Sequence, residues 1–211
     1  MPTTIDHLVL GSSNLDSLSA WWRGAAGEPA TAGGAHVGRG TRNELVGLGE
    51  TSYLELIGPD REQPAPANPR PFGIDRLTSD KPVLLTFAVA VADLEAARDR
   101  YRAAGLETTE PFAMERVTPQ GEHLAWRLSL PLADQIAGVI PFLIEWGSTT
   151  SHPATSLHQS STLRELRLRY PKPEMVRSLA TSLGLDVSVA RGDASLEAVI
   201  ETGNGVVALR S

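Results

Sequence analysis

The sequence predicts an α+β fold built from repeated βαβββ modules, and three observations lead to this prediction. A short apolar segment is followed three times by a helical pattern and then by segments of alternating apolar and polar residues. Each helical pattern begins after Asn, Asp or Pro and ends near a glycine, which are typical helix boundaries. The apolar period changes from helical spacing to alternation after each helix, and alternation is typical of strands.

The first module begins with a predicted strand over residues 5–10. Asn14 is a suitable N-cap for the helix that follows, and Gly27 is a suitable C-cap. After the helix, residues 42–48 and 52–57 alternate as two strands joined by a short turn.

The second module repeats this order. A predicted strand over residues 83–91 leads to Asp93 at the start of a helix, and the helix ends near Gly105. Residues 123–130 and 141–147 then form two further predicted strands, with a longer connection between them than in the first module.

The third module begins with a predicted strand over residues 163–168. Pro171 and Pro173 mark a helix start, and Gly184 marks its end. Two strands follow, over residues 196–201 and 206–210, around the hairpin sequence Gly203-Asn204-Gly205.

These repeats divide the chain into modules at residues 1–60, 83–147 and 162–211. The linker over residues 61–82 is rich in proline, which disfavours regular structure, and the linker over residues 148–161 is polar. Two interpretations stay open for these linkers. Both are passive spacers, or one of them folds over a pocket.

Composition excludes several classes of protein. The net charge of −6 argues against a general nucleic-acid binder and against docking on an anionic membrane, because both need a basic surface. The absence of cysteine removes disulfides, thiolate metal sites and a cysteine nucleophile. The sequence contains no recognisable signal peptide and no apolar run long enough to span a bilayer, so we expect a cytoplasmic protein.

Two glutamates lie inside otherwise apolar strands. Alternation places Glu55 on the same strand face as Tyr53 and Ile57, and it places Glu145 on the same face as Leu143. A carboxylate in an apolar strand is costly to bury unless another group pairs with it. Two such carboxylates at corresponding places in a repeat suggest one shared cavity.

Several motifs resemble a known family. The strand Ile5-Asp6-His7-Leu8-Val9, the segment from His36 to Asn43 and the strand Tyr53-Leu54-Glu55-Leu56-Ile57 are similar to the glyoxalase-like domain group of the vicinal-oxygen-chelate superfamily (glyoxalase, bleomycin resistance and dioxygenase proteins). The segment from Pro141 to Glu145 agrees, and the resemblance covers nearly the whole chain.

The resemblance implies that two modules pair into a cupped mixed sheet, the vicinal-oxygen-chelate fold, with the third module added to it. It also implies a metal site from the first and last strands of each of the two modules. Those positions correspond to His7, Glu55, Thr86 and Glu145 in this sequence. Thr86 departs from the pattern, because a neutral hydroxyl is a poor metal ligand, and we count it as a candidate substrate contact.

Three partners could satisfy the carboxylates. His7, Glu55 and Glu145 could bind a divalent metal, and this nitrogen and oxygen ligation suits Zn, Mn, Fe, Ni or Co. Arg127 is the alternative partner for Glu145, since its planar guanidinium matches a carboxylate. Solvent in an open cleft is the third possibility.

Other side chains are candidates for contacts with a ligand. His36 lies in a glycine-rich segment followed by Asn43, and we interpret both as part of a pocket rim that orients a polar substrate. Trp126 and Arg127 are adjacent on one strand and must face opposite sides, so one of them lines the pocket. Arg127 there would attract an anionic ligand. His152, in the second linker, we expect to be structural or solvated.

Two functions remain open. One is a metal-dependent lyase or isomerase, with a dioxygenase less favoured, in which Glu55 or Glu145 moves a proton on a small carbonyl or carboxylate substrate. The other is a metal-free binding or resistance protein that sequesters a small molecule in the cup. A structural module that mediates assembly is a third and weaker hypothesis, and pairing of modules between chains would give a homodimer.

Overall fold

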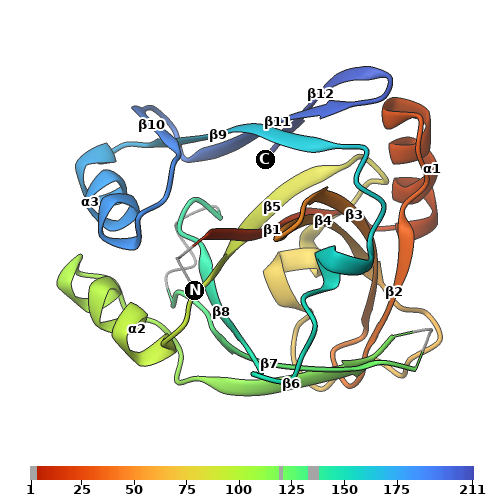
Figure 1. Cartoon of the computed structure of the whole chain (residues 1–211), viewed down its shortest axis with the longest axis horizontal. Coiled ribbons are helices and arrows are strands. Elements are labelled where there is room, and N and C mark those ends of the chain that lie inside the picture. Colours follow the sequence, from red (N-terminus) through yellow and green to blue (C-terminus); the bar gives the residue numbers. More distant parts are fainter. Residues whose placement is uncertain (1–3, 119–120, 133–137) are drawn as a thin grey trace.

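The computed structural model describes residues 4–118, 121–132 and 138–211. The described chain contains an eight-stranded sheet, a four-stranded sheet and three α-helices (Figure 1). The large sheet is strongly curved, and the small sheet lies across its outer face. None of the helices in these ranges is long and apolar enough to cross a membrane.

The elements follow one order three times, a strand, a helix and three strands. The first set is β1 (Thr4–Gly11), α1 (Leu15–Ala26), β2 (Thr31–His36), β3 (Thr41–Gly49) and β4 (Ser52–Pro59). The second set is β5 (Val83–Ala90), α2 (Leu94–Ala103), β6 (Phe112–Val117), β7 (His123–Ser129) and β8 (Phe142–Trp146). The third set is β9 (Thr162–Tyr170), α3 (Pro173–Leu183), β10 (Ser188–Arg191), β11 (Ser195–Thr202) and β12 (Gly205–Arg210).

The first two modules form the large sheet, as the predicted fold class requires. Its strand order is β2-β3-β4-β1-β5-β8-β7-β6. The modules meet where β1 pairs with β5 in antiparallel orientation, and within each module the first strand pairs in parallel with the last. The predicted α+β fold with a cupped mixed sheet is therefore confirmed.

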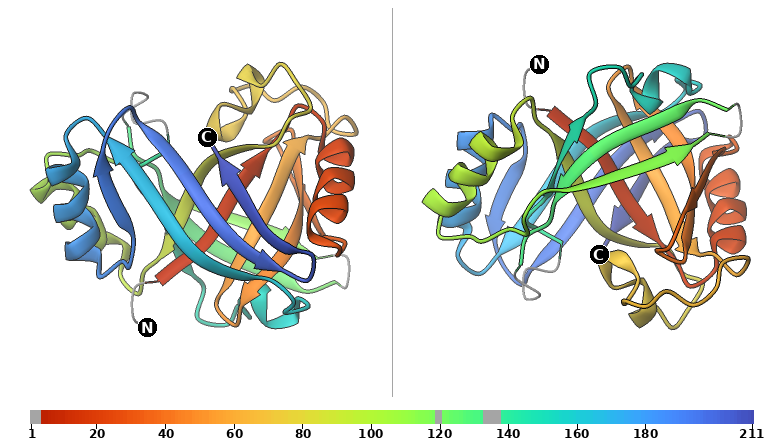
Figure 2. Two further views of the ribbon diagram at one scale, coloured as in Figure 1. Left: turned by 90° about the horizontal axis from the view of Figure 1, so that it is seen from above. Right: turned by 90° about the horizontal axis from the view of Figure 1, so that it is seen from below.

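The third module repeats the order of elements without repeating their topology. Its sheet has the order β10-β9-β11-β12, so β9 lies between β10 and β11. In the first two modules the first strand instead pairs with the last. Seen from above and below in Figure 2, the strands of this small sheet lie over the outer face of the large one.

Local sequence explains the helix ends. The side chain of Asn14 accepts hydrogen bonds from the backbone amides of Asp16 and Ser17, and Gly27 ends α1 with φ of 78°. Asp93 caps α2 in the same way, through the amide of Ala96. These predicted caps are confirmed, as is the two-residue hairpin between β11 and β12.

Three strands escaped prediction, namely β2, β6 and β10, and all three are edge strands of their sheets. The sequence pattern assigns no element to residues 31–35 and places only His36 in a glycine-rich segment. They form a strand because β3 offers hydrogen-bond partners, with an irregularity in the register between Ala32 and Gly34. Gly33 is required there, since a Cβ atom would lie 2.1 Å from the Asn43 side-chain oxygen.

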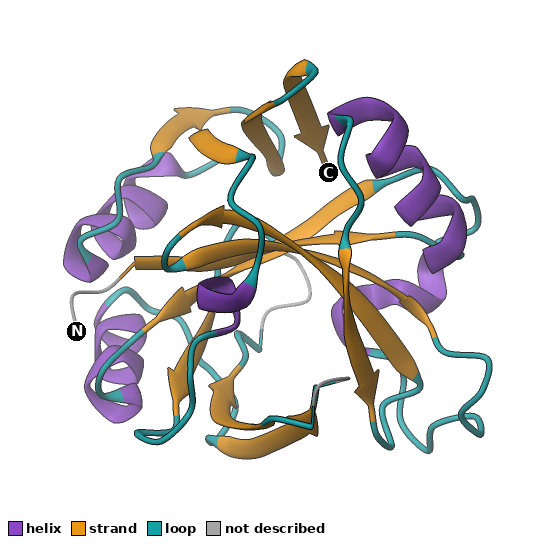
Figure 3. Ribbon diagram, turned by 45° about the vertical axis from the view of Figure 1, so that its right-hand side comes forward, coloured by secondary structure: helices purple, strands orange, loops and turns teal. Residues whose placement is uncertain are grey.

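The large sheet separates two apolar clusters. Its outer face packs against the helices and the small sheet (Figure 3). The fully buried side chains there include Trp22, Phe87 and Tyr101. Its inner face carries a second cluster around Trp126, Phe142 and Ile144. The two edges of the sheet approach each other, since Arg116 on β6 donates a hydrogen bond to the carbonyl of Gly33 on β2. The curved sheet therefore encloses a hollow on its inner face.

Candidate functional site

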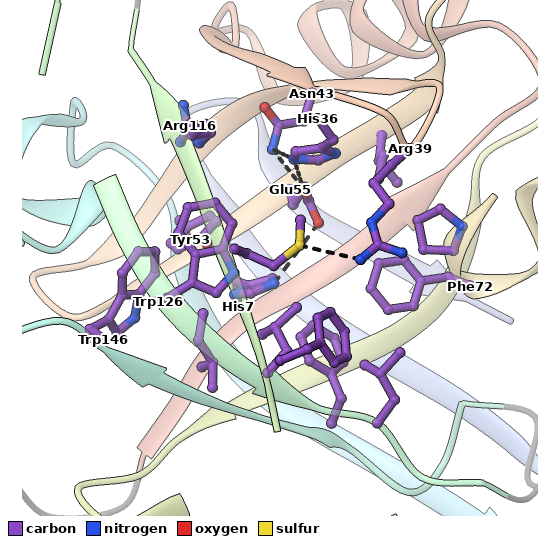
Figure 4. Close-up of a pocket in the computed structure, with 18 of the residues that line it drawn as sticks. His7, His36, Arg39, Asn43, Tyr53, Glu55, Phe72, Arg116, Trp126 and Trp146 are labelled. Atoms are coloured by element: carbon purple, nitrogen blue, oxygen red, sulfur yellow. Dashed lines mark hydrogen bonds and ion pairs between the residues drawn. The ribbon is translucent and has the colours of Figure 1, made fainter. Parts of the chain in front are cut away.

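The hollow is a cavity of about 200 Å³, smaller than the usual range for small-molecule sites (Figure 4). The two modules contribute different chemistry to its wall. The first supplies most of the polar groups, which are His7, His36, Arg39, Asn43, Tyr53 and Glu55. The second supplies mainly apolar and aromatic side chains, which include Phe112, Met114, Trp126, Leu128, Phe142, Ile144 and Trp146.

Glu55 lies at the centre of the polar side of the cavity. Alternation along β4 directs Tyr53, Glu55 and Ile57 into the hollow, as predicted. The Asn43 side-chain amide donates a hydrogen bond of 2.6 Å to Oε1 of Glu55. His36 Nε2 lies 3.6 Å from Oε1, and His7 Nε2 lies 3.9 Å from Oε2. One carboxylate is thus held by an amide and faced by two imidazoles (Figure 4).

A buried carboxylate orients His7. Asp6 Oδ1 lies 2.6 Å from His7 Nδ1, and Asp6 Oδ2 accepts from Trp146 Nε1 at 2.7 Å. His152 Nε2 is 3.1 Å from the same Oδ2. Burial opposes ionisation of Asp6, but hydrogen bonds from His152 and His7 outweigh it and hold the Asp6 pKa well below its usual value. Because ionised Asp6 can only accept, Nδ1 of His7 is the donor in this contact, and Nε2 is the ring nitrogen that faces Glu55.

The Asp6–His7 contact depends on a β-bulge. Neighbouring residues on a regular strand point to opposite faces, so Asp6 and His7 would be separated. The pairing of β1 with β5 is irregular between Ile5 and His7, and Asp6 is the extra residue there. Sequence alternation alone could not reveal this, and Asp6 was therefore missed as a site residue.

His36 and Tyr53 complete the polar wall. His36 Nδ1 is 2.9 Å from the Thr41 hydroxyl, and burial lowers the His36 pKa despite the opposing effect of Glu55. Tyr53 stacks on His7 with 4.6 Å between ring centroids. Burial raises the pKa of Tyr53 well above its usual value, so its phenol stays protonated and is a hydrogen-bond donor.

Glu145 does not share this cavity, so the predicted grouping of Glu55 with Glu145 is wrong. Phe142, Ile144 and Trp146 point inward from β8, and Glu145 points to the opposite side of the sheet. There it pairs with Arg127 at 2.6 Å and accepts from the backbone amide of Leu94 at the start of α2. The alternation along β8 was read correctly, but the opposite face of the strand forms the wall of the cavity.

Arg127 lies outside the cavity for the same reason. Trp126 lines the cavity and Arg127 projects outward, as adjacent residues on a strand must. The alternative partner proposed for Glu145 is therefore the one observed. The expected contact of Arg127 with a ligand in this cavity is contradicted by its position.

The second module lacks the polar positions of the first. Thr86 does not line the cavity, and its hydroxyl donates a hydrogen bond of 3.3 Å to the carbonyl of Gly138. On β4, Glu55 pairs with Val9, which lies two residues after His7. On β8, Phe142 pairs with Ala88, which lies two residues after Thr86. By sheet register Phe142, rather than Glu145, occupies the place of Glu55.

These positions do not fit the four-position metal site that the family resemblance implies. Two of its four donors, Thr86 and Glu145, do not line the cavity, and they interact with Gly138 and Arg127 instead. The Asn43 amide, a donor, lies between Glu55 Oε1 and His36 Nε2, at 2.6 and 3.2 Å. Across the described ranges, no three or more His, Asp or Glu side chains are arranged to bind a metal ion.

The proline-rich linker covers the mouth of the cavity. Pro69, Pro71 and Phe72 line it, and the Phe72 ring stacks on Phe142 at 5.1 Å. Phe72 has a φ of 58°, which is strained for a non-glycine residue and directs the ring into this contact. Of the two interpretations left open for the linkers, these contacts favour a role at the pocket for the first one. The second linker contributes His152 to the Asp6 network.

Glu145 should contribute to stability through α2. We expect Glu145→Ala to lower the free energy of unfolding by about 1–2 kcal/mol, because it removes an ion pair and a helix-start hydrogen bond. Urea denaturation measures this change. Glu115→Ala is the matched control, since Glu115 is exposed and pairs only with exposed His123, and it should change stability by less than about 0.5 kcal/mol. Equal losses of stability in the two variants would contradict the structural role of Glu145.

His36 should make stability depend on pH. Its pKa is lowered from 6.5 in the folded protein, so below pH 6.5 the unfolded chain gains a proton at His36 that the folded chain resists. The free energy of unfolding should then fall on acidification by up to about 1.4 kcal/mol per pH unit, until the folded pKa is reached. His36→Gln should remove this slope in urea denaturation between pH 8 and 5, whereas a variant of exposed His158 should keep it. An unchanged slope in His36→Gln would contradict the assignment.

Comparison with known proteins adds a family. A family model described as a glyoxalase-like domain matches residues 5–184. No curated protein sequence matches the chain. Among solved structures, a hypothetical protein from Staphylococcus aureus is 17% identical with a TM-score of 0.62, over 99% of this chain and 85% of that one.

A triple mutant of 4-hydroxymandelate synthase from Streptomyces coelicolor is 16% identical with a TM-score of 0.51, over 99% of this chain and 62% of that one. Methylmalonyl-CoA epimerase from Streptomyces coelicolor is 21% identical over 72% of this chain and 99% of that one, with a TM-score of 0.49. At these identities the first two likenesses support the fold alone.

Proposed function

The chain belongs to the glyoxalase-like domain family, and we propose that it catalyses proton transfer on a small carbonyl compound, as an isomerase or lyase. The observation that supports this most directly is the pairing of two bases in one cavity. Glu55 Oε2 and His7 Nε2 are 3.9 Å apart, and each has a lone pair that can face a ligand. Both atoms are buried beside a wall of aromatic rings.

Glu55 is the group that removes the proton. Its Oε1 is held by Asn43, which fixes the carboxylate and leaves Oε2 for the substrate. The Oε2 atom takes a proton from the carbon next to a carbonyl. The electrons of that C–H bond form a C=C bond, and the π electrons of the carbonyl move to its oxygen, which gives an enolate. Return of a proton to the opposite face of the same carbon restores the carbonyl and inverts that carbon, which is an isomerisation.

His7 and Tyr53 are placed to assist this step. His7, whose Nδ1 is committed to Asp6, offers Nε2 as a second site that accepts and returns a proton. Tyr53 is protonated, and its hydroxyl makes no hydrogen bond to another described residue, so it is a donor available for the enolate oxygen. These groups come from β1 and β4, which pair directly, so their spacing is fixed by the sheet.

The rest of the cavity sets the kind of substrate. Trp126, Phe142 and Trp146 form a wall that favours an apolar or aromatic body and excludes water from the reacting atoms. The small volume and the cover formed by Phe72 favour a compact molecule. A substrate with one carbonyl group and one ring or short apolar chain matches this arrangement.

Hydrogen–deuterium exchange tests the proposal. We expect the protein in D₂O to accelerate exchange of the α-hydrogens of phenylacetone or phenylpyruvate, followed by proton NMR against the uncatalysed rate. Quenching of the fluorescence of Trp126 and Trp146 reports binding separately. Binding of these compounds without faster exchange would reject the proposed enzymatic activity. It would favour the alternative of a metal-free binding protein, which the mainly apolar wall of the cavity supports.

A further inference from the structure

Two arginines, Arg39 and Arg116, line the cavity. Within the described part of the chain, neither forms an ion pair with a carboxylate. Many exposed arginines elsewhere do, such as Arg164 with Glu201. A guanidinium left without a carboxylate beside a cavity is a common feature of sites that bind anions.

Arg39 is the one whose donors remain available. Arg116 donates to the carbonyl of Gly33, which joins the two edges of the sheet. Arg39 donates only a weak hydrogen bond to the sulfur of Met114, at 3.7 Å. Its guanidinium carbon lies 5.4 Å from the centroid of the Phe112 ring, so the ring orients the planar group and leaves N–H donors free.

The turn that carries Arg39 is held in place from both sides. The amide of Gly38 donates to the Gln63 side chain at 3.1 Å, and Arg70 Nε donates to the carbonyl of Gly40 at 2.7 Å. Both partners belong to the linker that covers the cavity. The backbone at Arg39 is therefore held in place before a ligand arrives, whereas the exposed side chain is oriented by Phe112 and Met114.

Figure 4 shows Arg39 entering the cavity from the side opposite Trp126 and Trp146, with Glu55 between them. We propose that Arg39 binds a carboxylate on the substrate, so that the natural substrate is a small carbonyl compound with a carboxylate group. This inference rests on the proposed function and specifies its substrate class. The carboxylate would hold one end of the molecule while the carbonyl end lies near Glu55.

A pair of ligands of similar shape tests this inference. Phenylacetate and phenylacetamide have nearly the same shape and differ in charge and in one hydrogen-bonding group, an oxygen acceptor in place of an NH₂ donor. Their affinities can be measured by tryptophan fluorescence and by calorimetry. We expect the parent protein to bind phenylacetate more tightly. Arg39→Met should weaken the binding of phenylacetate by about ten- to a hundredfold, because hydrogen bonds to a charged group are lost. It should leave the affinity for phenylacetamide unchanged. Arg39→Lys should restore part of the affinity, since it keeps the charge without the planar fork.

Arg164→Met is the control, because it makes the same change in net charge on the exposed side of the small sheet. It should leave both affinities unchanged. Equal binding of the two ligands by the parent, or equal losses in Arg39→Met and Arg164→Met, would overturn the inference. This measurement does not need turnover. If Arg39→Met weakens phenylacetate binding but the parent protein does not accelerate deuterium exchange, the anion site is supported and the proposed enzymatic activity is rejected.

Discussion

Glu55→Gln should reduce catalysed deuterium exchange by about 10²–10⁴-fold, the usual contribution of a general base. The substitution keeps the shape of the side chain and its contact with Asn43, but an amide cannot accept the proton. Proton NMR of the α-hydrogens measures the rate, and tryptophan fluorescence measures ligand binding in the same samples. We expect binding to change much less than the rate.

The matched control is Glu115→Gln on β6, whose side chain is exposed and outside the cavity. This variant should catalyse deuterium exchange at the same rate as the parent protein. Parent-like exchange by Glu55→Gln would show that another group removes the proton, and the proposed role of Glu55 would be rejected.

Asp6→Ala should be the most destabilising substitution at the site, with a loss of about 3–5 kcal/mol in the free energy of unfolding. Asp6 is fully buried and accepts from three donors, on His7, Trp146 and His152. Alanine leaves all three without an acceptor. Urea denaturation at neutral pH measures the loss, with Asp99→Ala as control, because Asp99 forms only an exposed pair with Arg102.

Acidification provides a second measure of Asp6. Its folded pKa lies below 3.8, so its stabilising contribution is complete above pH 3.8 and is lost as the pH falls towards the folded pKa. The difference in stability between the parent and Asp6→Ala should therefore narrow below pH 3.8. A difference of less than about 1 kcal/mol at neutral pH would contradict the network.

The order of elements could be predicted from the sequence, because it depends on local chemistry. Asn14 and Asp93 cap helices through amides two or three residues away, and the turn between β11 and β12 uses its own glycines. The inward direction of Glu55 also follows from local alternation. So do the opposite directions of Trp126 and Arg127. Each of these features is decided by residues close together in the chain.

The edge strands required tertiary pairing. Residues 31–36 contain two adjacent glycines and have no strong strand preference, yet they form β2 because β3 lies beside them. The third module shows the same dependence on a larger scale. Its elements follow the same order as in the other modules, but the pairing of β9 with β10 and β11 is set by packing on the large sheet.

The sequence by itself determined the three repeats, the helix ends and the face of β4 that carries Glu55. Only the tertiary structure decided which face of β8 forms the cavity wall, and therefore that Glu145 pairs with Arg127 outside it. It also decided the bulge that brings Asp6 to His7. The physical reason is that alternation fixes which residues share a face, whereas sheet curvature and register fix which face is enclosed.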